Sequence, residues 1–152
     1  MKISLQKNNK IYSKYFYPLL DNAFSKEDII SGIKVLISGQ LTMSKKTRDF
    51  EKEFAYKLGR KYALMVNSGS SANLLAVFAS CNPLRKNRFK PGDEALIPAL
   101  CWSTSLWPLV QGGLKPVFVD VDKDTLNVNS DLLVKKITNK TKVIMLVHVL
   151  GN

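Results

Sequence analysis

The turn Asn67–Asn73, rich in small residues, is the part of this 152-residue chain best suited to bind an anion. It follows an apolar run and opens a stretch of helical composition. Small residues at a helix start leave backbone N–H groups free, and the helix dipole adds partial positive charge there. Gly69 lets a ligand approach the backbone, while Ser68, Ser70 and Ser71 supply hydroxyl groups. This spacing predicts either a phosphate cradle or a polar turn in which a serine caps the helix, and it does not decide between them.

A second candidate site, residues 98–104, follows the next apolar run along the chain. Ligands of open α/β sheets bind at the carboxyl ends of the strands. Trp102 at such a position could stack against a flat ring. On spacing alone, a tryptophan packed in the core is the simpler interpretation, and Trp107, further along the expected helix, is expected in the core.

Two other polar features are expected to be structural. Asp120, Asp122 and Asp124 alternate like metal ligands, but the segment lacks the glycine and the terminal glutamate of a calcium loop, so we expect a solvated turn and no metal. His148 is the only histidine and stands in an apolar stretch. Because no serine or cysteine partner can be named for it, we expect a structural role.

The expected helices have recognisable start and stop signals. Ser25 and Asp28 resemble a capping box in front of an apolar-periodic stretch that ends at Gly39. A second helix is expected over 44–59, because three apolar residues in it follow the helical spacing of four. Further helices are expected at 72–81 and 132–137, and a turn that leads into a helix is expected at 100–111.

Short apolar runs predict four strands, at 62–66, 95–98, 115–119 and 143–147. They alternate with helices and are nearly all apolar, which predicts an α/β fold with a mainly parallel sheet covered on both faces. Residues 1–24 show no clear period, and we expect an N-terminal arm there. Residues 25–152 are expected to be the first part of a larger domain, because a loop and a crossover helix normally follow such a last strand.

The composition is that of a globular protein, with 45% hydrophobic and 23% charged residues and no apolar run of bilayer length. The first residues lack the apolar block of a secretory signal, and Cys81 and Cys101 form no CxxC pair, so we expect a cytoplasmic protein without a membrane partner. The net charge of +11 keeps open a second class, a non-catalytic basic module that binds phosphate-bearing ligands or nucleic acid. The basic residues are spread along the chain, however, and we do not expect a nucleic-acid partner.

Five segments together resemble one enzyme family, the DegT/DnrJ/EryC1/StrS family, in order and spacing over about residues 20–152. They read GQLTMSKKTRDFEKEFA, NSGSSANLL, PGDEALIPALCWSTS, KPVFVDVDKDTLNV and ITNKTKVIMLVHVLGN. Members are fold-type I, pyridoxal-phosphate-dependent nucleotide-sugar aminotransferases and their dehydratase relatives. The resemblance therefore implies the N-terminal part of a fold-type I large domain, a nucleotide-sugar substrate, pyridoxal or pyridoxamine 5'-phosphate as cofactor, and a homodimer.

The resemblance also implies roles for single residues. Gly69, Ser70 and Ser71 match the family's site for the cofactor phosphate, which favours the cradle over the plain turn. Trp102 matches the aromatic residue that stacks on the pyridine ring, which reverses the preference for a core tryptophan. The cofactor-binding residues expected on this basis are Ser68, Gly69, Ser70, Ser71, Trp102 and Thr104, while Asn67 is expected to shape the turn and Ser103 to contact cofactor or substrate.

The catalytic residues of the family are expected outside this chain. The Schiff-base lysine and the acid that pairs with the pyridine nitrogen follow the last expected strand in the family, so the resemblance places both after Asn152. Transamination of a nucleotide-linked keto-sugar, in surface polysaccharide or deoxysugar biosynthesis, is the function expected first. The alternative is pyridoxamine-phosphate-dependent 3-dehydration of a 4-keto-6-deoxy nucleotide sugar, the branch in which a histidine replaces the lysine. We expect the chain by itself to be inactive.

Overall fold

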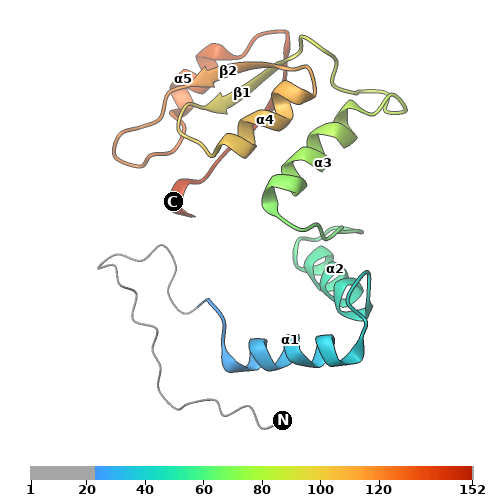
Figure 1. The fold of residues 1–152 in the computed structure, drawn as a ribbon. Helices are drawn as coiled ribbons and strands as arrows, with labels where there is room; N and C mark the ends of the chain where they lie inside the picture. The colour runs from blue at the N-terminus through green and yellow to red at the C-terminus, as the bar shows by residue number, and fades with distance from the viewer. Residues whose placement is uncertain (1–22, 152) are drawn as a thin grey trace. The chain divides into compact units, whose positions relative to one another are not determined.

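The computed structural model describes residues 23–151, which belong to two compact units, Met1–Met65 and Val66–Asn152. The expected N-terminal arm, 1–24, lies outside the described residues except for its last two positions. The elements in chain order are α1 (Lys26–Ser38), α2 (Lys45–Lys57), α3 (Gly69–Cys81), β1 (Glu94–Pro98), α4 (Ser103–Gln111), β2 (Lys115–Val119), α5 (Ser130–Lys136), β3 (Thr141–Ile144) and a 3-10 turn, Val149–Gly151 (Figure 1).

Helix α1 begins at the predicted capping box. The Ser25 Oγ accepts from the Asp28 N–H at 3.1 Å, and the Asp28 carboxylate accepts from the Ser25 N–H at 2.9 Å. The Ser25 N–H and the Ser25 hydroxyl both donate to the Asp28 carboxylate, and these two hydrogen bonds lower the pKa of Asp28 below its ordinary value. The helix ends at Gly39 in the left-handed conformation, with φ of 68°, where the Gly39 N–H donates to the Leu36 carbonyl.

Helix α2 also lies where the sequence predicts it, between Ser44 as N-cap and the positive-φ Gly59. Phe50 and Phe54 stack on one of its faces, with ring centroids 5.5 Å apart. Ala55 is buried against the returning chain.

The prediction of a strand at 62–66 is wrong. The segment is extended but forms no ladder within the described residues, and its Tyr62 and Leu64 side chains are 78% and 71% exposed. Its backbone bonds to helix α2 through the Met65 N–H, which donates to the Glu51 carboxylate at 2.9 Å. An apolar run becomes a strand only where a neighbouring strand offers backbone partners, and none of residues 23–151 does so here.

The described sheet is three-stranded, in the order β2-β1-β3, and both pairs are parallel as predicted. Glu94 pairs with Lys115 on one side of β1 and with Thr141 on the other. Strand β3 is shorter than the predicted 143–147 and starts earlier, although the Met145 N–H still donates to the Leu96 carbonyl at 2.8 Å.

The core lies between the sheet and helices α3 and α4. Ala95 and Ile97 of β1 point to this side and pack with buried Val77 of α3, Leu109 of α4 and Leu114. Leu96, between them in β1, is fully buried from the other side, so both faces of this central strand are covered as its apolar run predicts. Helix α5 packs against β2 (Figure 1). None of the described helices is long and apolar enough to cross a bilayer.

Candidate cofactor-binding site

The predicted turn at 67–73 folds into the first turn of helix α3. Ser68 is the N-cap, and its Oγ accepts from the Ser71 N–H at 3.1 Å. The helix therefore starts at Gly69, earlier than the predicted Ala72, because a serine cap brings the small residues inside the helix. The structure thus has both a serine cap and an exposed helix start. The cap is compatible with the phosphate cradle as well as with the plain polar turn.

The backbone at this helix start is open to a ligand. Within residues 23–151, the N–H groups of Gly69 and Ser70 have no acceptor. No atom lies within 4 Å of the position that a Cβ on Gly69 would occupy. Two N–H donors, the positive end of the α3 dipole and free space beside Gly69 together suit a phosphate group.

The start of helix α4 lies beside the start of α3. The Ser70 Oγ donates to the Thr104 Oγ1 at 3.0 Å, and the Asn73 amide Nδ2 donates to the Thr104 carbonyl at 3.4 Å. The structure therefore brings together Ser70 and Thr104, two of the predicted site residues. Asn73 was not among the predicted site residues, because its role depends on a helix that comes much later in the sequence.

A hollow of about 270 Å³ opens between the two helices. It is lined by Ser70, Ser71, Leu74, Thr104, Trp107, Pro108 and Gln111. The expectation that Trp107 is a core residue is wrong, since its side chain is 54% exposed. The buried stripe of α4 consists of Ser105, Pro108 and Leu109, and Trp107 lies off that stripe.

Trp102 is the N-cap residue of α4, in extended conformation, and its carbonyl accepts from the Ser105 N–H at 2.9 Å. Its side chain is 74% exposed, so the interpretation of Trp102 as a packed core residue is wrong. Ser103, the first residue of α4, is also exposed. The start of α4 thus presents a free indole and, two residues on, the Thr104 hydroxyl that contacts Ser70.

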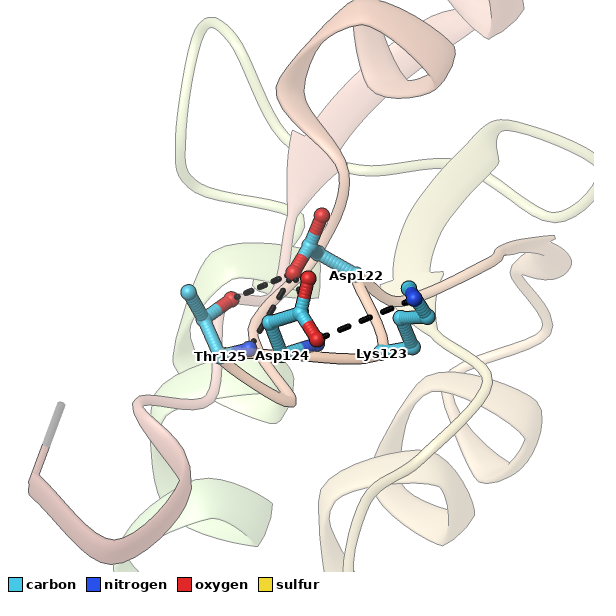
Figure 2. A network of polar contacts seen from close by, with 4 residues as sticks. All are labelled: Asp122, Lys123, Asp124 and Thr125. Carbon is cyan, nitrogen blue, oxygen red and sulfur yellow. Dashed lines mark hydrogen bonds and ion pairs between the residues drawn. The ribbon is translucent and has the colours of Figure 1, made fainter.

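The alternating aspartates form the predicted solvated turn (Figure 2). The Asp122 Oδ1 accepts from the N–H groups of Asp124 at 2.9 Å and Thr125 at 3.1 Å, and these hydrogen bonds lower the pKa of Asp122. The Lys123 Nζ lies 4.0 Å from the Asp124 Oδ1. Within residues 23–151 no group of acidic, histidine and cysteine side chains is arranged to hold a metal ion, and His148 is exposed.

Comparison with known proteins identifies the family to which these elements belong. Residues 23–152 match the sequence profile of the DegT/DnrJ/EryC1/StrS aminotransferase family. The chain belongs to this family. The resemblance predicted from the five sequence segments is therefore confirmed.

The similar proteins of this family include dehydratases and aminotransferases of sugars. The chain is 43% identical, over 90% of its length, to a GDP-4-keto-6-deoxy-D-mannose 3-dehydratase of Yersinia pseudotuberculosis, of which it covers 34%. The solved Escherichia coli enzyme of the same name, with bound hydrated PLP, superposes with a TM-score of 0.82 at 42% identity, covering 90% of this chain and 35% of that one. A putative sugar aminotransferase of Streptococcus pneumoniae, in its PMP form, superposes with a TM-score of 0.67 at 30% identity, covering 80% of this chain and 29% of that one.

These matches confirm the predicted fold, the N-terminal part of a fold-type I enzyme. The chain spans about a third of the length of the relatives it matches. The roles of its site residues stay predictions.

Proposed function

We propose that the protein containing this chain is a pyridoxamine-phosphate-dependent 3-dehydratase of a 4-keto-6-deoxy nucleotide sugar. The observation that carries this proposal is the higher similarity to dehydratases, at 42–43% identity, than to the putative sugar aminotransferase, at 30%. Transamination of a nucleotide-linked keto-sugar, expected first from the sequence, becomes the second candidate. It keeps the support of the aminotransferase similarity.

This chain would contribute the phosphate side and one ring face of the cofactor site. At the start of α3 the N–H groups of Gly69 and Ser70 have no acceptor among the described residues, and a phosphate dianion there would gain from the helix dipole. Ser71 and Thr104 line the same hollow and offer hydroxyl groups. Trp102, exposed at the start of α4, would stack against the pyridine ring. Ser68 would hold the turn by capping α3.

Bound here, the cofactor would supply an electron sink for the substrate carbon. The residues of this chain bind and orient it, and we assign no proton transfer to any of them. The Schiff-base lysine or its histidine replacement, and the acid at the pyridine nitrogen, are proposed to follow Asn152. A homodimer in the cytoplasm and a nucleotide-sugar substrate complete the proposal. A mutant of a related GDP-4-keto-6-deoxymannose 3-dehydratase has been solved with bound GDP-perosamine, which supports a GDP-linked sugar.

The reaction type can be tested on the full-length protein. It is incubated with GDP-4-keto-6-deoxymannose, pyridoxal phosphate and glutamate, and the product is analysed by mass spectrometry. A dehydratase yields a sugar without its C3 hydroxyl, whereas an aminotransferase yields a sugar with an amino group in place of the keto oxygen. Absence of both products and of any bound cofactor would instead favour the basic phosphate- or nucleic-acid-binding module.

The site assignment has its own test. Trp102→Ala and Ser70→Ala should each weaken pyridoxamine phosphate binding, while Trp102→Phe, which keeps an aromatic face, should retain most of it. If both alanine variants bind the cofactor as the unchanged protein does, the site assignment is wrong.

A further inference from the structure

Helix α4 contains a proline that leaves one of its carbonyls without the usual partner. In an α-helix each carbonyl accepts from the N–H four residues later. The residue four positions after Thr104 is Pro108, which is buried within the helix and has no N–H. A proline ring at this position also crowds the carbonyl four residues earlier, here that of Thr104.

A side chain of the neighbouring helix supplies the missing donor. The Asn73 Nδ2, in the second turn of α3, donates to the Thr104 carbonyl at 3.4 Å, in a part-buried position. Asparagine has a lower helix propensity than alanine in a helix interior. Helix propensity therefore does not explain an asparagine at this position, and the hydrogen bond to α4 does.

Thr104 is thus bound to α3 at two points. Its carbonyl accepts from Asn73 and its hydroxyl accepts from Ser70. Trp102 lies only two residues before Thr104, at the N-cap of α4. Any rotation or slide of the first turn of α4 would move Trp102 relative to the free N–H groups at the start of α3.

We propose that Asn73 is a positioning residue: by replacing the hydrogen bond that Pro108 removes, it fixes the aromatic platform of α4 relative to the phosphate cradle of α3. This inference rests on the proposed cofactor site. Asn73 need not touch the cofactor, and its effect passes through Thr104. The hydrogen bond fixes two parts of one ligand's site at the required separation, so its loss should affect a ligand that contacts both parts more than one that contacts the cradle alone.

Four forms of the full-length protein test the proposal: unchanged, Asn73→Ala, Pro108→Ala and the double variant. Asn73→Ala should weaken pyridoxamine phosphate binding about five- to tenfold. This is the lower part of the range for leaving a hydrogen-bond acceptor unsatisfied, because water partly reaches the Thr104 carbonyl. Inorganic phosphate, which needs only the cradle, should lose less than twofold. Pro108→Ala restores an N–H to α4, so adding Asn73→Ala to it should cost less than twofold.

Ser80→Ala is the matched control. Its hydroxyl lies on the same helix and donates to the Ala76 carbonyl at 2.9 Å without reaching α4, so cofactor affinity should stay within twofold. Urea unfolding of every variant monitors the fold. A role of Asn73 in stabilising α3 alone would predict equal losses for both ligands and no rescue by Pro108→Ala.

The outcomes separate the two proposals. If the unchanged protein binds pyridoxamine phosphate and Asn73→Ala binds it equally well, the positioning role is refuted and the proposed function stands. Equal losses in the two Asn73→Ala backgrounds also refute the positioning role. If the unchanged protein binds no cofactor, the proposed function fails, and the role of Asn73 toward that cofactor fails with it.

Discussion

Thr104→Val tests which hydroxyl of the Ser70–Thr104 pair donates to a bound phosphate. The Ser70 hydroxyl donates its single proton to the Thr104 Oγ1 at 3.0 Å. The Thr104 hydroxyl acts as acceptor in this pair, so its own proton is free to point into the hollow that both residues line. On the proposed cofactor site, we therefore expect Thr104 to be the side-chain donor to the phosphate, although it lies further along the chain from the cradle.

The expected losses differ between the two substitutions. If the proposed site is right, Thr104→Val removes a hydrogen bond to the phosphate, a change of about 1.5–3 kcal/mol, or roughly 10- to 150-fold in affinity. Ser70→Ala removes a bond between two neutral hydroxyls and leaves the Thr104 donor in place. That change costs about 0.5–1.5 kcal/mol, or roughly two- to tenfold.

Isothermal titration of pyridoxamine phosphate into the cofactor-free full-length protein measures both losses. Thr104→Ser, which keeps the hydroxyl, should recover most of the affinity, and pyridoxamine without its phosphate should bind Thr104→Val and the unchanged protein alike. A loss for Ser70→Ala that equals or exceeds the loss for Thr104→Val would refute the reasoning, because it would make Ser70 the donor to the phosphate.

Three further expectations concern stability and titration. Leu109→Ala, at a fully buried position, should lower the free energy of unfolding by about 2–5 kcal/mol in urea experiments followed by tryptophan fluorescence; a loss below 1 kcal/mol would contradict the described core. Gly112→Ala should cost about 1–3 kcal/mol in the same assay, because its Cβ would lie 3.1 Å from the Val77 Cγ1, whereas Gly32→Ala, with open space around it, should not destabilise. The Ser25 N–H and hydroxyl hold the pKa of Asp28 below 3.8, so their contribution to folding is present above that pH and is lost as the pH falls through the folded pKa. Ser25→Ala removes the hydroxyl and keeps the N–H, so it should raise this pKa part of the way toward 3.8 in an NMR titration, and an unchanged value would argue against the bond from the hydroxyl to the carboxylate.

The helices could be predicted because their signals are local. Helix α1 begins at the capping pair Ser25 and Asp28 and ends at the left-handed Gly39. Each of these signals involves only a few neighbouring residues. The buried strand β1 was equally clear, because an apolar run in a parallel sheet needs cover on both faces and receives it. In each case the feature depends on residues that are close in sequence or on burial alone.

The wrong predictions concern features that depend on residues far away in the sequence. Residues 62–66 are as apolar as β1, but no described strand pairs with them, and composition carries no information about that pairing. Trp107 is a large apolar residue of a kind often found in cores. Because Leu109 is on the buried side of α4, the helical spacing places Trp107 off that side, and its side chain is half exposed. The orientation of a short helix follows from its contacts, which the sequence does not specify by itself.

The candidate site was predictable one residue at a time. Family resemblance indicated Gly69, Ser70, Trp102 and Thr104 as separate positions. That Ser70 and Thr104, 34 residues apart, share a hydrogen bond depends on how α3 packs against α4. Asn73 could have been found by one signal, an amide residue inside a helix that faces a proline-containing helix, but only after the two helices had been paired.

The strand order β2-β1-β3 sets a sequence of events during synthesis. Strand β1 is made first, and we expect it to pair with β2 before β3, because the shorter connection through α4 closes at the lower entropic cost. Its other edge, Glu94–Leu96, then waits for β3, which emerges later. In that interval an apolar strand presents unpaired N–H and C=O groups to any other chain nearby. Between the synthesis of Val119 and Ile144 we therefore expect this edge to favour association of one nascent copy with another.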